Sequence, residues 1–163
     1  MDVQDLTEKL CACGSLDRAA AAQQLCESAE EARPAAVALV RAVGDEDEAV
    51  QEWATAALEE LGPPEVKDLP HLVELVADKN DDVAYWAVTL LGRLEAEGTE
   101  GVDVLTDALH ESRQMIVRQR AAWALGRIGS SEAAVQEALT SAANDSDARL
   151  ARLASEALQA IGD

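Results

Sequence analysis

One pattern of apolar residues recurs along the chain at a nearly constant step. Its clear copies begin at Val50, Val83, Val117 and Leu150. One step before Leu58 lies Leu25, which marks a weaker copy near the N-terminus. Internal repeats with a period as long as the step from Val50 to Val83 are typical of small helical units, which bury their apolar faces only by stacking on one another. The repeat therefore predicts a stacked array of helices.

Each copy contains a shorter helix A followed by a longer helix B. Apolar residues in helix B follow a helical spacing, as in Val50, Ala54 and Leu58. In helix A, pairs such as Leu72 and Val76 recur at the same step. We expect copies one to five at residues 1–29, 30–62, 63–96, 97–129 and 130–163, all within a single domain, 1–163. The predicted fold class is all-α, a right-handed α-solenoid of about five helix pairs.

Polar residues and glycines mark the ends of each predicted helix B. The acidic residues Asp45 to Asp47 precede one of these helices, and Asn80 precedes the next. Such side chains cap the free amide groups at a helix start and complement the helix dipole. Three glycines follow the last apolar residue, where a left-handed C-cap is favoured: Gly62, Gly129 and Gly162.

The charge of the chain is strongly negative and unevenly distributed. The net charge is −19, and residues 1–100 carry 23 acidic and 7 basic side chains, against 9 and 6 in residues 101–163. Lysine and arginine supply the affinity of proteins for phosphate groups. We therefore expect neither nucleic acid nor membrane among the partners. The negative charge either keeps the protein soluble or attracts a basic partner.

The first residues and the cysteines favour a cytoplasmic protein. The chain starts with an acidic segment that lacks the apolar run of a signal peptide. Cys11, Cys13 and Cys26 are odd in number and lack C-x-x-C spacing, which indicates reduced thiols rather than disulfides. Cys11 and Cys13 would point to different sides of a helix, and both histidines lie far along the chain. We expect no metal site and no cofactor.

The segment Trp123-Ala124-Leu125-Gly126-Arg127-Ile128-Gly129 resembles the A-L-G-R-I-G signature of short HEAT-like repeats of the phycobilisome-lyase type. The segment from Thr89 to Leu94 is similar to the same signature, and the acidic residues before each helix B resemble the family's D-x-x-x-V-R opening. The resemblance covers nearly the whole chain and implies a HEAT-like fold. It leaves the function open, because such repeats occur in scaffolds, bilin lyase subunits, an iron hydroxylase and DNA glycosylases.

Two of these enzyme classes do not fit the sequence. The hydroxylase that this fold resembles binds two irons through several His-Glu pairs near helix B, whereas this chain has one such pair, His110-Glu111, at the end of a helix A. The glycosylases need a basic face for DNA, which a chain of charge −19 lacks. The sequence also contains no G-x-S-x-G, P-loop or G-x-G-x-x-G motif. We therefore expect a non-catalytic protein.

One face of the helices B carries the candidate binding residues. On a helical wheel this face lies opposite the buried stripe, and by resemblance it lines the concave side of a HEAT stack. Tyrosine, tryptophan and arginine dominate interface hot spots, and all three occur on it. The candidate residues form ridges of Tyr85, Thr89 and Arg93 in copy three and of Gln119, Trp123 and Arg127 in copy four, with Arg152 in copy five.

Arg120 completes the set of candidate binding residues. It occupies the repeat position of Trp53 and Trp86 at the edge of the buried stripe, where we expect packing between repeats, with Arg120 over the Trp86 ring. Gly92 and Gly126 lie within helix B, where glycine costs about 1 kcal/mol relative to alanine. They either open room beside the ridges or allow neighbouring helices to pack closely.

These features favour a non-catalytic scaffold or adaptor that binds a protein or peptide on the helix-B face. The alternative is a bilin lyase-like subunit that binds a tetrapyrrole in the same groove. A third possibility is self-association through the last repeat. This repeat shows no polar outer face of the kind that caps a repeat array, and it keeps the apolar residues Leu150, Leu153 and Leu158.

Overall fold

The computed structural model describes residues 2–12, 14–28 and 30–162, and Cys13 lies outside these ranges. The described residues form ten α-helices and three 3-10 helices, with no strand. The helices group into two compact units, unit 1 (Met1–Asp68) and unit 2 (Leu69–Asp163). The all-helical prediction is confirmed, and the predicted helices A and B alternate along the chain.

Unit 1 contains the helix pairs of copies one and two. Its core is formed by fully buried leucines, among them Leu25, Leu39 and Leu58. The helix B of copy one, α2, packs on that of copy two, α4, while α1 packs on α2 and α3. The elements of this unit are α1 (Val3–Ala12), α2 (Ser15–Glu27), η1 (Arg33–Ala35), α3 (Ala36–Ala42), α4 (Glu48–Glu60) and η2 (Val66–Asp68).

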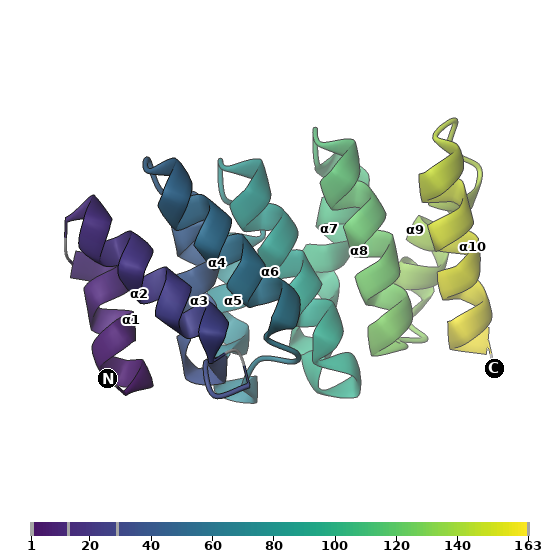
Figure 1. The fold of residues 1–163 in the computed structure, drawn as a ribbon. Coiled ribbons are helices and arrows are strands. Elements are labelled where there is room, and N and C mark those ends of the chain that lie inside the picture. The colour runs from purple at the N-terminus through teal and green to yellow at the C-terminus, as the bar shows by residue number, and fades with distance from the viewer. Residues whose placement is uncertain (1, 13, 29, 163) are drawn as a thin grey trace. The chain divides into compact units, whose positions relative to one another are not determined.

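Unit 2 contains the helix pairs of copies three, four and five. Within it α8 packs between α6 and α10, and in Figure 1 these three helices lie in front of α5, α7 and α9. Leu91 and Leu125 are fully buried at equivalent repeat positions, and Leu150 is fully buried at the repeat position of Val117. The elements of this unit are α5 (Leu69–Leu75), α6 (Asp81–Arg93), η3 (Glu95–Gly101), α7 (Val102–Glu111), α8 (Met115–Ile128), α9 (Ala133–Ala143) and α10 (Ala148–Gly162).

Several ends of the helices B follow the predicted capping pattern, whereas α2 and α8 begin after Gly14 and Gln114 without a side-chain capping hydrogen bond. The side chain of Asp47 accepts a hydrogen bond from the Ala49 amide at 3.0 Å, and Asn80 accepts two at the start of α6. Gly129 ends α8 with a φ of +76°, in the left-handed region that a side chain would strain. Gly162 differs from the prediction because it still belongs to α10.

Gly92 and Gly126 allow the helices of unit 2 to approach closely. A Cβ atom on Gly92 of α6 would lie 2.9 Å from the Cα of Ala124 on α8. A Cβ atom on Gly126 of α8 would lie 2.9 Å from the Cα of Ala157 on α10. Non-bonded carbon atoms in proteins do not approach one another this closely. Of the two interpretations of these glycines, the structure supports close helix packing.

The same type of ion pair occurs in both units at equivalent repeat positions. In unit 1, Nε of Arg18 lies 2.7 Å from Oδ2 of Asp45, and Nη2 lies 2.8 Å from Oδ1. In unit 2, Nη2 of Arg118 lies 2.9 Å from Oδ2 of Asp145. The hydrogen bond from Arg18 holds the pKa of the Asp45 carboxyl below its ordinary value. Each pair joins a helix B to the loop between helices A and B of the next copy.

Candidate protein-binding surface

The helix-B face of unit 2 carries a cluster of two aromatic rings and an arginine on α6. The rings of Tyr85 and Trp86 meet edge to face, with centroids 5.6 Å apart and planes at 84°. The guanidinium carbon of Arg93 lies 5.7 Å from the centroid of the Trp86 ring. An arginine at this distance is attracted by the negative face of the ring. Trp86 is buried, whereas Tyr85 and Arg93 are half-buried.

Arg120 of α8 joins this cluster to Trp123. Its guanidinium carbon lies 4.6 Å from the centroid of Tyr85 and 5.0 Å from that of Trp123. Nη2 of Arg120 also donates a hydrogen bond to the Tyr85 hydroxyl. Arg120 therefore lies between Tyr85 and Trp123, and the expectation that it lies over Trp86 is wrong. Arg93 occupies that place because it lies two helical turns from Trp86 on the same helix.

The cluster concentrates positive charge within a strongly acidic chain. Burial, and then repulsion from Arg120, lower the pKa of the Arg93 guanidinium. An arginine remains charged at neutral pH even so. Among the described residues, no carboxylate forms an ion pair with Arg120. A carboxylate on a partner would therefore gain attraction at this point, without first displacing an internal acid.

A shallow pocket of about 330 Å³ lies beside Trp123, between α8 and α10. Arg127 at its edge forms an ion pair with Glu95, and Arg152 forms one with Glu156 at 2.7 Å. Both pairs are exposed, and such pairs contribute at most about 1 kcal/mol. A bound partner could therefore rearrange them at little cost. The lining residues include Trp123, Gly126 and Arg127 from α8 and Leu153, Glu156 and Ala157 from α10.

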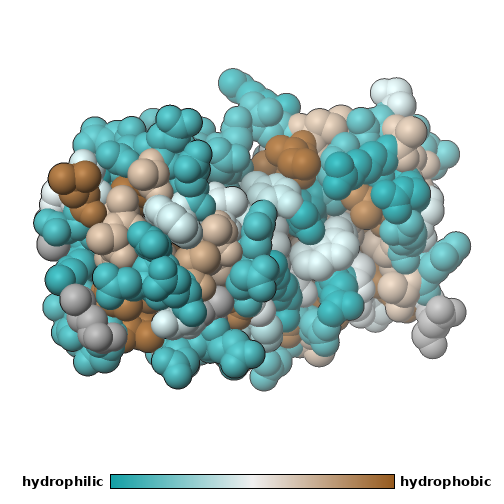
Figure 2. Space-filling model, in the orientation of Figure 1, coloured by the Kyte–Doolittle hydropathy of each residue, from teal (hydrophilic) through white to brown (hydrophobic). Residues whose placement is uncertain are grey.

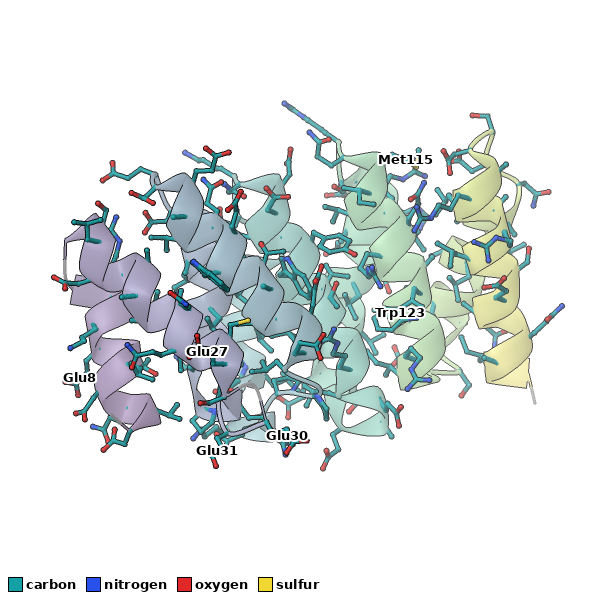
Figure 3. All side chains as sticks on the ribbon, viewed as in Figure 1. Glu8, Glu27, Glu30, Glu31, Met115 and Trp123 are labelled. Atoms are coloured by element: carbon teal, nitrogen blue, oxygen red, sulfur yellow. The ribbon has the colours of Figure 1, made fainter. Side chains whose placement is uncertain are left out.

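Figures 2 and 3 place this surface on the face of unit 2 seen in Figure 1. Hydrophilic side chains cover most of that face, and paler ones gather over α6 and α8 in Figure 2. Figure 3 shows Trp123 near the middle of α8, well along the helix from Met115 at its start. Trp123 is half-buried, so part of its ring remains open to solvent.

Two of the eight candidate residues do not lie on an open surface. Thr89 is 3% exposed, and its hydroxyl donates to the carbonyl of Tyr85 in the preceding turn at 2.8 Å. Gln119 is 8% exposed, and its amide donates to Asp147 at 2.9 Å. Their accessible position was a prediction of the helical wheel, and it is wrong. Of the other six, four are half-buried and two are exposed: the half-buried residues are Tyr85, Arg93, Arg120 and Trp123, and the exposed ones are Arg127 and Arg152.

The sequence prediction missed two acidic residues at this surface. Glu156 falls on the same wheel face as Arg152, so the pattern contained a signal for it. Glu95 lies just beyond α6 and has a φ of +51°, which is not helical. A helical wheel therefore does not predict where its side chain points. Its contact with Arg127 depends on how α6 and α8 pack. Trp86 was expected to pack between repeats, and it also supports Tyr85 and Arg93.

Three further expectations concern metal ligands, the His110-Glu111 pair and membrane-spanning helices. Across ranges 2–12, 14–28 and 30–162, no group of three or more His, Cys, Asp or Glu side chains is placed to hold a metal ion. His110 and Glu111 lie at the end of α7, as expected. No helix in these ranges is both long and apolar enough to cross a bilayer. Trp53 of unit 1, at the repeat position of Trp86, is 37% exposed.

Comparisons with known proteins identify the repeat type. A family model described as HEAT repeats matches residues 5–92 and 69–162. No curated protein matches the chain. The solved structures that match include designed armadillo repeat proteins, and because their sequence identities are low they show the fold alone.

Three of these structures illustrate the likeness. The crystal structure of an engineered protein is 24% identical, with a TM-score of 0.66, and the match covers 98% of this chain and 78% of that one. A designed armadillo repeat protein is 18% identical, with a TM-score of 0.62 and coverage of 98% and 82%. A structure of computationally designed armadillo repeat proteins for modular peptide recognition is 18% identical, with a TM-score of 0.64 and the same coverage of both chains. The predicted α-solenoid class is thereby confirmed.

Proposed function

Because the chain belongs to the HEAT-repeat family, we propose that it is a non-catalytic scaffold or adaptor that holds a protein or peptide segment on the helix-B face of unit 2. The observation that carries this proposal is the position of Arg120 between the half-buried rings of Tyr85 and Trp123. Within the described ranges, this arrangement joins an arginine without a carboxylate partner to two aromatic surfaces, and it lies next to a pocket.

The residue types at this surface support a protein partner over a small metabolite. Tyrosine, tryptophan and arginine are the side chains most enriched at binding hot spots. The neighbouring pocket, at about 330 Å³, is small and shallow, and it suits one side chain of a partner. Designed armadillo proteins of similar fold were made for modular peptide recognition, which supports a peptide as the bound partner.

The surface also predicts the chemistry of the bound segment. Arg120 and Arg93 attract a carboxylate, and the Trp123 ring with Leu153 offers an apolar contact. A segment that combines an acidic and an apolar side chain fits both features. The free thiols Cys11 and Cys26 support a reducing compartment such as the cytoplasm.

The test compares proteins captured from lysate by the wild type and by two variants. The Trp123→Ala, Arg127→Ala double variant removes the ring and the charge at the pocket. The Trp53→Ala variant removes an exposed tryptophan from unit 1 and serves as the matched control. Each captured protein is then purified and its affinity measured by calorimetry. We expect the double variant to bind at least about 30-fold more weakly, since hot-spot truncations cost about 2 kcal/mol or more. Equal affinity of both variants for the purified partner would refute the proposed site.

The bilin lyase-like alternative predicts a different ligand at the same surface. A tetrapyrrole would have to lie against Trp123 in a pocket at the lower end of the volumes seen for small-molecule sites. The pocket size therefore favours the peptide. Absorbance spectra of added bilin, with wild type and with the Trp123→Ala variant, distinguish the two, because only the lyase-like function predicts a spectral change that depends on Trp123.

A further inference from the structure

Copy three has a glutamate at a position where its neighbouring copies have glycine. Glu95 lies one repeat after Gly62 and one repeat before Gly129. The three residues have φ angles of +51°, +72° and +76°, in the left-handed region that residues with a Cβ atom rarely adopt. Within the part of the chain that the structure describes, Glu95 is the one residue other than glycine with a positive φ. The chain therefore holds a side chain at a position where the backbone favours glycine.

The Glu95 side chain belongs to the pocket beside Trp123. Its carboxylate accepts a hydrogen bond from Nη2 of Arg127, and both residues line the pocket. Glu156, which is paired with Arg152, contributes a second carboxylate to the lining. The side chains of Glu95 and Arg127 are 57% and 51% exposed, and ion pairs this exposed contribute less to stability than a strained backbone residue typically costs. Stability alone therefore does not account for this glutamate.

Arg120 differs from Arg127 in its access to an incoming carboxylate. No carboxylate forms an ion pair with Arg120 among the residues that the structure describes, and its guanidinium lies between two aromatic rings. A carboxylate that approaches Arg127 must instead displace Glu95, and it also meets Glu156 in the pocket lining. Like charges repel one another, so the two arginines are not equivalent anion sites.

We propose that Glu95 is a specificity-determining residue, which directs the acidic side chain of a bound segment to Arg120 and keeps acidic side chains out of the Trp123 pocket. This inference rests on the function proposed above and defines the partner more closely. The bound segment carries one acidic side chain for Arg120 and an uncharged, apolar side chain for the pocket. A segment with a second acidic residue at the pocket is rejected by repulsion, which is a common source of specificity.

The first test selects random peptides displayed on phage against the wild type and against Glu95→Gly. The variant should fold normally, because glycine holds this position in the neighbouring copies. We expect wild-type peptides with one acidic residue and Glu95→Gly peptides with two, because the variant frees Arg127. Glu97→Gln changes the net charge equally but is exposed and outside the pocket lining, so it should select the same peptides as the wild type.

The second test measures affinities of synthetic peptides by calorimetry. One peptide is selected by the wild type, and its derivative carries glutamate in place of the apolar residue whose alanine substitution weakens binding most. The wild type should bind the derivative at least about tenfold more weakly, because like charges meet in the pocket. Glu95→Gly should narrow this ratio by about three- to fivefold, the range expected for an exposed ion pair. An Arg127→Gln background should abolish the narrowing, since Glu95 acts through Arg127.

An equal ratio in the wild type and Glu95→Gly, or an equal narrowing in Glu97→Gln, would overturn the proposal. If Glu95→Gly folds poorly, Glu95→Gln removes the charge with almost no change of shape and gives the same comparison.

The outcomes separate this inference from the function on which it rests. Peptides that bind Trp123→Ala as tightly as the wild type would refute the helix-B surface itself, and selection of no peptide by the wild type would refute both. Peptides that require Trp123 but carry equal numbers of acidic residues on the wild type and Glu95→Gly would leave the surface intact and refute the role of Glu95.

Discussion

Replacing Gly92 by alanine tests the close approach of α6 and α8. A Cβ atom at this position would lie 2.5 Å from Cζ3 of Trp123 and 2.9 Å from both Cα and Cβ of Ala124. The Trp123 ring can turn aside, because it is half-buried. The Ala124 atoms cannot, because they belong to the backbone of the facing helix or are fixed directly to it. The two helices would have to separate by several tenths of an ångström.

Two opposing effects set the size of the change. In an isolated helix, alanine is more stable than glycine by about 1 kcal/mol. Overpacking a tight contact costs about 1–3 kcal/mol, and contact with backbone favours the upper part of that range. We therefore expect Gly92→Ala to lower the free energy of unfolding by about 1–2 kcal/mol, which corresponds to a fall in Tm of about 2–8 °C for a chain of this size.

The assay is urea unfolding followed by far-UV circular dichroism, with Gly162→Ala as the control. A Cβ atom on Gly162 would meet nothing within 4 Å, so that variant should not lose stability. The Gly92→Ala variant should also show a changed Trp123 environment in its fluorescence before unfolding begins. If Gly92→Ala is instead more stable than the wild type by about 1 kcal/mol, as in an isolated helix, the inference that α6 and α8 touch at this glycine is refuted.

Three further predictions concern the core, the ion pairs and self-association. Leu125→Ala empties a fully buried site on α8 and should cost about 2–5 kcal/mol in calorimetric or denaturant unfolding. Asp45→Asn should lower stability at neutral pH. Because the Asp45 pKa is lowered in the folded chain, its contribution is present above the unfolded value of about 3.9 and is lost as the pH falls through the folded value. The difference between this variant and the wild type should therefore shrink below about pH 4 in unfolding measured across pH, and a constant difference would contradict the reasoning. Self-association through α10 predicts a sedimentation coefficient that rises with concentration in the wild type and less so in Leu158→Ser.

The repeat made the helical framework predictable from the sequence. The step from Leu58 to Leu91 and Leu125 placed three fully buried side chains correctly, because each copy must present the same residue to the same neighbour. The caps at Asp47 and Asn80 followed from local hydrogen bonding alone. Features that one helix and its own ends determine could be read from the sequence.

The binding surface was less predictable, because it depends on contacts between copies. A helical wheel treats each helix as isolated, whereas α8 is covered on two sides by α6 and α10. This widens its buried face to include Gln119, whose partner Asp147 comes from the loop before α10. Arg120 shows the same limit of the helical wheel. Its repeat position could be read from the sequence, but its long side chain can reach several neighbours. Only packing shows that it lies between Tyr85 and Trp123.

The two compact units each carry tryptophan, which makes their unfolding separately observable. Trp53 belongs to unit 1, and Trp86 and Trp123 belong to unit 2. Stacked repeats unfold together only when the interface between neighbours is strong relative to the stability of each repeat. Fluorescence of a Trp53→Phe variant reports unit 2, and fluorescence of a Trp86→Phe, Trp123→Phe variant reports unit 1. Coincident unfolding transitions would show that the two units unfold as one cooperative body, and separated transitions would show that they unfold independently. The native tryptophans distinguish the two outcomes without an added label.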